Sequence, residues 1–385
     1  MRFLALTLLL AASGIAAGQS ATPASPVWQM QQSGTTAGLR GIDSVDGTVA
    51  WASGTGGTVL RTIDGGAHWT QCATPDAAKD GATLDFRGVQ AWDATTAIVM
   101  ASGPGEKSRL YKTIDGCKTW ELIFKNPDKD GFWDAFHFQS FKFEKRQLYS
   151  GWLLGDPVRG QFSLFNSEDR GRRWIRQTNK GLSVETGTQS AFAASNSSLF
   201  ADSGFVYFGT GGAKGAFVYS VVEIEVCLDG SDDDVDKEGR KDKWIHQPVL
   251  FGESNNSTGV FSIGVRHDTG NAPGFSNRYK AFVAVGGDYT KPNESAGSAA
   301  WSADSGQHWT ASTTPPHGFR SAVQWSESLR LWITVGTNGS DISRDDGKTW
   351  QPIDDGNWNA LSLPFVVGPN GRIARLNPAA LASAK

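Results

Sequence analysis

The stretch RTIDGGAHW (residues 61–69) decides the fold, because related stretches recur along the chain with the pattern Ser/Thr-x-Asp-x-Gly-x-x-Trp. The Asp and Trp of the five clear copies are Asp64 and Trp69, Asp115 and Trp120, Asp169 and Trp174, Asp304 and Trp309, and Asp345 and Trp350. Neighbouring copies lie about 40 to 55 residues apart, with one longer gap of about 135 residues. A repeat of this length predicts a propeller or a similar repetitive architecture.

Two copies depart from the pattern. In the second clear copy Cys117 stands where the motif has its Gly. A degenerate copy, CLDG (residues 227–230), lies inside the long gap, with Asp229 as its Asp. An acidic segment, residues 229–243, follows before Trp244 and is interpreted as a solvated hairpin insertion.

A second signal gives the number of units. Short segments of alternating apolar residues precede the motifs, and a seventh follows the last one: LRGIDSV, FRGVQAW, WDAFHFQS, QSAFAAS, VFSIGV, FRSAVQW and WNALSLP. The seventh unit is unfinished at the C-terminus, so the N-terminal segment VWQMQQ (residues 27–32) is expected to supply its missing strand. The sequence therefore predicts an all-β, seven-bladed β-propeller in which the N-terminal strand closes the last blade and leaves no free sheet edge.

The first unit predicts the strands of a blade in the order LRGIDSV, TVAWASG, TVLRTI and HWTQCA. The repeated motif is then the turn between the third and fourth strands, on the outer side of the ring. There the Asp can accept backbone N–H bonds, the Gly can take a positive φ, and the Trp can pack across the sheet. We therefore expect this motif to be structural.

Composition and the N-terminus indicate the compartment. The 385 residues include 46 Gly and 15 Trp, which suits many short strands, and the net charge of -3 gives no basic face for nucleic acid. Residues 1–18 are typical of a cleaved signal peptide, which predicts a secreted or periplasmic protein with one domain over residues 19–385 and no membrane span in the mature chain. We expect a monomer. Cys72, Cys117 and Cys227 allow at most one disulfide, and a Cys72–Cys117 pair is one option.

The motifs resemble the Asp-box, or bacterial neuraminidase (BNR) repeat, of the sialidase-like propellers. Within that group, LRGIDSV...AWASGTGGTVLRTIDGGAHW resembles the photosystem II stability/assembly factor-like family, in its bacterial secreted branch. Four further segments resemble that branch and carry no assigned chemistry: GDP (155–157), SAFAAS (190–195), GVFSI (259–263) and GGDY (286–289). Proteins with Asp-box repeats have unrelated activities, so the resemblance bears on the fold more than on function.

A propeller binds ligands where its innermost strands begin. The second positions of the seven inner segments are Arg40, Arg87, Asp134, Ser190, Phe261, Arg320 and Asn359. We expect Arg40, Arg87, Arg320, Asp134 and Asn359 to line one funnel mouth. Arginines there suit capture of carboxylate or phosphate groups. The alternative is that these side chains pair with one another and close the channel.

Two functions remain open. The first is a non-enzymatic binding or assembly module that holds a partner protein's peptide, or an anionic or saccharide ligand, at the mouth. The alternative is a glycoside hydrolase, sialidase-like or another exo-glycosidase, for which Asp134, Asp156 and Glu185 are the fallback catalytic carboxylates. We expect no metal, since none of the six His has a partner at metal-ligand spacing. We also expect no cofactor: GTGGAKGAF (209–217) lacks the helix that a nucleotide loop precedes.

Overall fold

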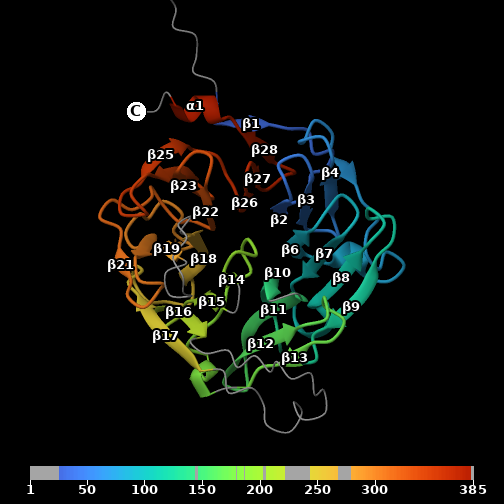
Figure 1. The fold of residues 1–385 in the computed structure, drawn as a ribbon, viewed down its shortest axis with the longest axis horizontal. Coiled ribbons are helices and arrows are strands. Elements are labelled where there is room, and N and C mark those ends of the chain that lie inside the picture. Colours follow the sequence, from blue (N-terminus) through green and yellow to red (C-terminus); the bar gives the residue numbers. More distant parts are fainter. Residues whose placement is uncertain are drawn as a thin grey trace, which may run out of the picture.

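The computed structural model describes residues 26–143, 146–178, 180–185, 187–202, 205–221, 243–267 and 279–382. Over these ranges the chain forms seven four-stranded antiparallel sheets. They stand as seven blades around a central axis, coloured in chain order from blue to red (Figure 1). The prediction of an all-β, seven-bladed propeller is confirmed.

Each blade runs from its innermost to its outermost strand. Blade 1 consists of β2 (Leu39–Ser44), β3 (Ala50–Gly54), β4 (Val59–Thr62) and β5 (Thr70–Gln71). Blade 2 consists of β6 (Phe86–Ala91), β7 (Ala97–Ala101), β8 (Arg109–Thr113) and β9 (Glu121–Lys125). Blade 3 consists of β10 (Trp133–Phe143), β11 (Arg146–Val158), β12 (Gln161–Ser167) and β13 (Ile175–Arg176). Blades 4 and 5 consist of β14 (Leu199–Asp202), β15 (Phe205–Thr210), β16 (Ala216–Val221) and β17 (Trp244–Val249); and β18 (Thr258–His267), β19 (Tyr279–Asp288), β20 (Ala299–Ser302) and β21 (Thr310–Ala311).

Blade 6 and blade 7 complete the ring. Their strands are β22 (Ala322–Ser326), β23 (Leu331–Gly336), β24 (Gly339–Ser343) and β25 (Gln351–Asp354); and β26 (Ala360–Ser362), β27 (Phe365–Val367), β28 (Ile373–Leu376) and β1 (Trp28–Met30). The described helices are short: three 3₁₀ turns at Gly81–Thr83, Gly105–Lys107 and Lys180–Leu182, and α1 (Pro378–Ala382). The strands of blade 1 match the four segments predicted for it.

The N-terminal strand closes the ring, as predicted. β1 pairs antiparallel with β28, with Trp28 opposite Leu376. Trp28 is buried, donates from its indole Nε1 to Ser340 Oγ at 2.8 Å and packs against Trp358 with ring centroids 6.1 Å apart. The outermost strand of blade 7 thus comes from the opposite end of the chain (Figure 1).

Each pair of neighbouring blades is joined in two ways. Apolar clusters fill the space between adjacent sheets, as around Trp51 and Val99 between blades 1 and 2. Near the axis, a backbone N–H of one blade donates to an acceptor of a neighbouring blade. The seven bonds run from Ala91 N to Asp43, Phe138 N to Gln90, Phe136 N to Asn196, Ile263 N to the Ser197 carbonyl, Val323 N to Ser262, Leu363 N to Gln324 and Ser44 N to Ser362. These bonds satisfy backbone donors that no neighbouring strand can reach.

The repeated motif forms the turn between the third and fourth strands, far from the axis. In blade 1 Thr62 Oγ1 donates to Asp64 Oδ1 at 2.8 Å, while the backbone N–H groups of Gly66 and His68 donate to Thr62 Oγ1 and Asp64 Oδ1. The hydrogen bonds from His68 and Thr62 lower the pKa of Asp64 to about 2. The same bonds recur at Asp115, Asp169, Asp304 and Asp345. The motif is therefore a structural turn in this fold.

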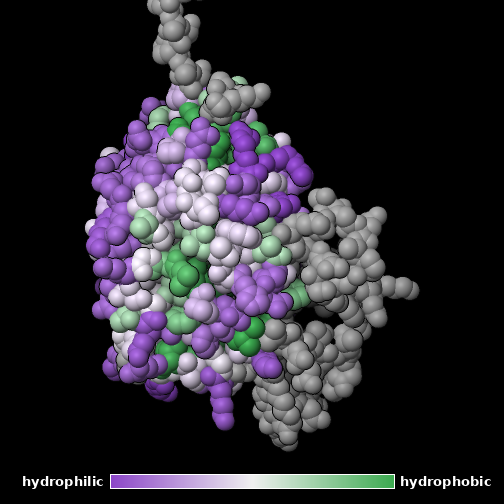
Figure 2. Space-filling view, turned by 90° about the vertical axis from the view of Figure 1, so that its left-hand side faces the viewer, coloured by the Kyte–Doolittle hydropathy of each residue, from purple (hydrophilic) through white to green (hydrophobic). Residues whose placement is uncertain are grey.

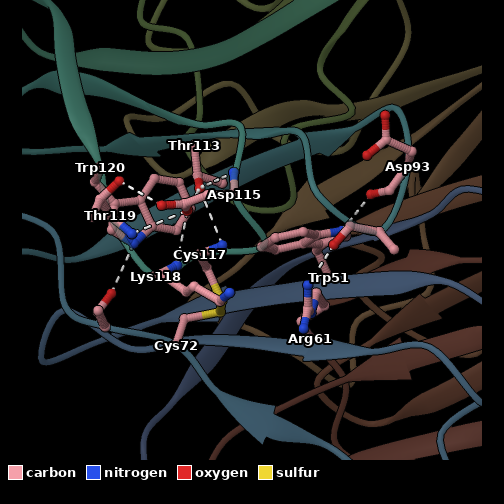
Figure 3. Close-up of a disulfide and its surroundings, with 12 residues drawn as sticks. Trp51, Arg61, Cys72, Asp93, Thr113, Asp115, Cys117, Lys118, Thr119 and Trp120 are labelled. Atoms are coloured by element: carbon pink, nitrogen blue, oxygen red, sulfur yellow. Dashed lines mark hydrogen bonds between the residues drawn. A yellow bond between two sulfur atoms is a disulfide. The ribbon is translucent and has the colours of Figure 1, made fainter.

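A disulfide joins Cys72 of blade 1 to Cys117 of blade 2, with Cα atoms 5.3 Å apart. Cys117 lies inside the repeated turn that Asp115 organises (Figure 3). Its backbone φ is 67°. The other four turns have Gly at this position, with φ between 81° and 85°. The chain thus accepts a non-glycine residue in the left-handed region where it places a bond between two blades.

Blade 4 departs from the predicted course of the chain. The inner strand of blade 4 is Leu199–Asp202 and not QSAFAAS, which instead leaves the sheet and enters the channel. The signal peptide (1–18), the degenerate turn at Asp229 and most of the insertion 229–243 lie outside the described residues.

The rim of blades 5 and 6 is largely hydrophilic with small, separate hydrophobic patches (Figure 2).

We predict that Trp28→Ala lowers the free energy of unfolding by about 3–5 kcal/mol, because it leaves a cavity at the seam where the ring closes. Met30→Ala, on the same strand but at a side chain 55% exposed, should change it by less than about 0.5 kcal/mol. Urea unfolding followed by circular dichroism measures both. Equal effects of the two substitutions would show that the seam does not depend on Trp28.

We predict that Cys72→Ser/Cys117→Ser lowers the free energy of unfolding by about 3–4 kcal/mol, because the bond closes a loop of 45 residues. Cys72→Ser/Cys117→Gly should recover about 1 kcal/mol of this loss, since glycine adopts the positive φ without strain. Urea titrations of both variants beside the oxidised wild type make the comparison. A glycine variant no more stable than the serine variant would contradict the account of the turn.

Candidate functional site

The channel is closed on its axis by a segment of blade 4, Ser190–Ser198, which we call the central segment (Figure 1). It begins at a bridge between Ser190 and Gly211. It then contacts four other blades. The Ala191 N–H donates to Asp156, the Ala193 carbonyl accepts from Arg87, Phe192 stacks on Phe261, and Ser195 Oγ donates to the Ser321 carbonyl. Its small Ala and Ser side chains allow this close approach. The mouth therefore has a floor instead of an open channel.

Two arginines and one aspartate form a charged group on one side of the mouth. Arg40 Nε lies 3.2 Å from Asp85 Oδ1, and Arg87 Nε donates to Asp85 Oδ2 at 2.9 Å. The side chains of Arg40 and Arg87 are 34% and 28% exposed. Burial lowers the pKa of Arg40, Asp85 opposes that shift, and Arg87 adds to it. Within this group of three side chains, one carboxylate is shared by two guanidinium groups, which leaves one positive charge not compensated by Asp85.

A pair of carboxyl groups lies beside Arg87. Asp134 is buried, and burial together with the negative charge of Asp156 raises its pKa well above the usual value. Burial also raises the pKa of Asp156 to about 6, against the hydrogen bond from the Ala191 N–H. Within the described residues Asp134 Oδ2 has no hydrogen-bond partner. The pair therefore holds a proton in a range where exposed carboxyl groups have lost theirs.

Aromatic side chains line the opposite side. Phe192 of the central segment stacks on Phe261 with centroids 4.1 Å apart, and Phe319 meets Phe261 edge-on at 4.8 Å. Tyr289 lies 6.0 Å from Phe261 and 6.5 Å from Phe192, and it is 52% exposed. This side offers an apolar surface with a hydroxyl group at its edge.

Asp288 holds the loop that carries Tyr289. Its two carboxylate oxygens accept hydrogen bonds from Ser257, Thr290 and Asn255. Burial would raise the pKa of Asp288, but these bonds lower it to about 2. Its oxygens are thus occupied within the protein, which suits a positioning role.

The structure does not bring all the predicted residues together. Arg320 is buried, ion-paired with Asp341 and hydrogen-bonded to Asn338 and His317, so its guanidinium is not available at the mouth. Asn359 donates to the Leu39 carbonyl at 2.7 Å and joins blade 7 to blade 1. Arg320 and Asn359 therefore follow the alternative interpretation given above, because their side chains pair with groups of the protein itself and not with a ligand.

The fallback carboxylates do not form one open group. Asp134 and Asp156 interact, but Asp134 is 2% exposed. Glu185 is 71% exposed and lies 3.4 Å from Lys214. The arrangement gives no support to the glycosidase alternative.

The four segments to which no chemistry was assigned meet around the mouth. GDP supplies Asp156, SAFAAS forms the start of the central segment, GVFSI supplies Phe261, and GGDY supplies Asp288 and Tyr289. Sequence reasoning missed Asp85 and the aromatic side. The spacing Asp-x-Arg at the start of the inner strand of blade 2 was a usable signal for Asp85, whereas the aromatic side joins the central segment to residues of blades 5 and 6 that are far apart in the sequence.

Among the described residues, no group of three His, Cys, Asp or Glu side chains is placed to hold a metal ion. No helix in the described part of the chain is long and apolar enough to cross a membrane.

We predict that Asp156→Asn flattens the dependence of stability on pH. With its pKa raised in the folded state, Asp156 of the native protein keeps a proton that the unfolded chain releases, so Asp156 makes stability fall as pH rises from about 4 to about 6. The free energy of unfolding of the variant, taken relative to that of the wild type, should therefore increase by about 1–2 kcal/mol when the pH is raised from 4.5 to 7.5. Urea unfolding at both pH values measures this difference. Asp130→Asn, at an exposed carboxylate before blade 3, is the control, and an equal gain there would refute the assignment.

No protein-family model matches the sequence, and no curated protein is significantly similar to it. Solved structures share its fold. One is described as "YCF48 bound to D1 peptide", with a TM-score of 0.56, 17% identity, and coverage of 91% of this chain and 97% of that chain. Another, "YCF48 from Cyanidioschyzon merolae", has a TM-score of 0.55, 18% identity, and coverage of 92% and 99%. In its fold, this chain is thus similar to the YCF48 propellers along nearly its whole length.

Proposed function

We propose that this chain is a non-enzymatic binding or assembly module that holds an acidic peptide of a partner protein at the mouth. The observation that carries the proposal is the placement of Arg40 and Arg87 on one side and of Phe192 and Tyr289 on the other, above a closed channel. Arginines suit the carboxylates of such a peptide, and the aromatic surface suits its apolar side chains.

The likeness in fold to a YCF48 structure with a bound D1 peptide supports a peptide as ligand. It also agrees with the resemblance of the repeats to the photosystem II stability/assembly factor-like family. We propose that the repeated turns are Asp-box repeats and that the chain is of the bacterial secreted type. An anionic saccharide is the other ligand that the arginines would accept, but it makes less use of the aromatic side.

We further propose that the protein works outside the cytoplasm, as a monomer. The signal-peptide pattern of residues 1–18 supports secretion or a periplasmic location. The disulfide between Cys72 and Cys117 supports an oxidising compartment. Cell fractionation of the full-length chain, followed by mass measurement of the mature N-terminus, tests the location.

We predict that Arg40→Ala/Arg87→Ala weakens binding of a fluorescein-labelled octapeptide of alternating aspartate and phenylalanine at least about tenfold, because two charge-assisted contacts are lost. Fluorescence anisotropy measures the affinity. Arg330→Ala, at an arginine 66% exposed on blade 6, is the matched control and should leave it unchanged.

The same peptide with asparagine in place of aspartate separates charge from hydrophobicity. We expect it to bind at least about tenfold more weakly to the wild type. Equal binding of the two peptides, or equal loss with Arg330→Ala, would contradict an arginine site. Competition by a polyanionic saccharide but not by the acidic peptide would favour the saccharide instead.

A further inference from the structure

A cavity of about 380 Å³ lies between blades 2 and 3. It is separate from the mouth: Trp92, in its lining, follows the C-terminal end of β6, whereas Arg87 lies near the start of the same strand. A six-residue strand spans about 20 Å, so the cavity opens toward the other face of the ring. The proposed peptide site does not include it.

The walls of this cavity are mostly aromatic and aliphatic. Trp92 is 38% exposed and meets Phe138 edge-on, with ring centroids 5.7 Å apart. Ile114, on the outer side, is 73% exposed. Tyr149 lies under the guanidinium of Arg170, at 3.9 Å from its ring centroid. These side chains form a cleft into which a flat or branched apolar group can pack.

Two cations, Lys112 and Arg170, line this cleft. Within the described residues neither forms an ion pair, although Glu121 lies opposite Lys112 in the pairing of β8 with β9. The pKa of Lys112 is lowered by burial and then by repulsion from Arg172 and Arg170, with weaker attraction from Glu121 and Asp169.

The lining includes one carboxylate, Asp93, which neighbouring backbone N–H groups hold in place. Asp93 Oδ1 accepts hydrogen bonds from the Thr95 and Thr96 N–H groups at 2.6 and 2.8 Å. Like charges held together beside an apolar cleft are stabilised by an anion that enters it.

We propose that this cavity binds a monocarboxylate that carries an aromatic or branched apolar group. The carboxylate meets Lys112 and Arg170, and the apolar group packs between Trp92 and Ile114. Such a group exists as a free small acid and as the last residue of a peptide, and the volume accommodates a single residue of this kind. This ligand class differs from the long acidic peptide proposed for the mouth. The proposal for the cavity does not depend on the proposal for the mouth.

The probe is N-acetyl-phenylalanine, with N-acetyl-phenylalaninamide as the uncharged comparison, titrated by isothermal calorimetry into the mature chain. We expect the acid to bind at least about tenfold more tightly than the amide. Lys112→Met keeps the aliphatic stem and should weaken binding of the acid at least about tenfold. Lys118→Met removes a charge from an exposed position in the turn of the same blade and should have no effect.

The variant Arg40→Ala/Arg87→Ala separates the two sites. Unchanged binding of the acid to this variant supports the cavity between blades 2 and 3. The proposal would be overturned if the acid no longer bound to Arg40→Ala/Arg87→Ala but still bound fully to Lys112→Met. Equal binding of the acid and the amide to the wild type would overturn it as well. A hexapeptide ending in phenylalanine identifies the source: tighter binding than that of the acid indicates a chain terminus, and weaker binding indicates a free small acid.

Discussion

The pairing of β1 with β28 is the interaction on which the rest of the structure depends. A ring of sheets can bury every inter-blade surface only if its two ends meet, and here an N-terminal strand completes the blade formed by the C-terminus. The seam is strengthened by Trp28, which contacts both blade 6 and blade 7. Because the ring is closed, each inner strand has two neighbours, and a hydrogen bond from backbone to acceptor joins every adjacent pair near the axis.

Closure of the channel follows from one departure from the regular blade. In blade 4 the chain leaves the sheet before its inner strand and contacts blades 2, 3, 5 and 6 on its way across. This segment gives the mouth a floor and places Phe192 against Phe261. It also supplies the N–H that holds Asp156 and the carbonyl that holds Arg87, so that the geometry of the charged and aromatic sides depends on the same nine residues.

Arginines at equivalent places in the repeat have different roles because their surroundings differ. Arg320 is enclosed with Asp341, where removal from water is offset by several hydrogen bonds. Arg40 and Arg87 share a single carboxylate and stay partly exposed, which is why we propose them as the residues that meet a ligand. The cavity between blades 2 and 3 shows a similar excess of cations at Lys112 and Arg170, on the other face of the ring. Partner acids and exposure decide which of these side chains can bind an anion.

The sequence by itself determined the number of blades, the strand order within a blade, the closing strand and the structural nature of the repeated turn. It could do so because these features rest on local patterns: alternation along a strand, turn chemistry and a motif that recurs at intervals of about 40 to 55 residues. Only the tertiary structure decided that QSAFAAS leaves its blade, that Arg320 is buried and that Asp85 joins Arg40 to Arg87. It also placed Cys72 next to Cys117. These outcomes depend on contacts between residues far apart in the chain, where packing and the desolvation of charge outweigh the repeat.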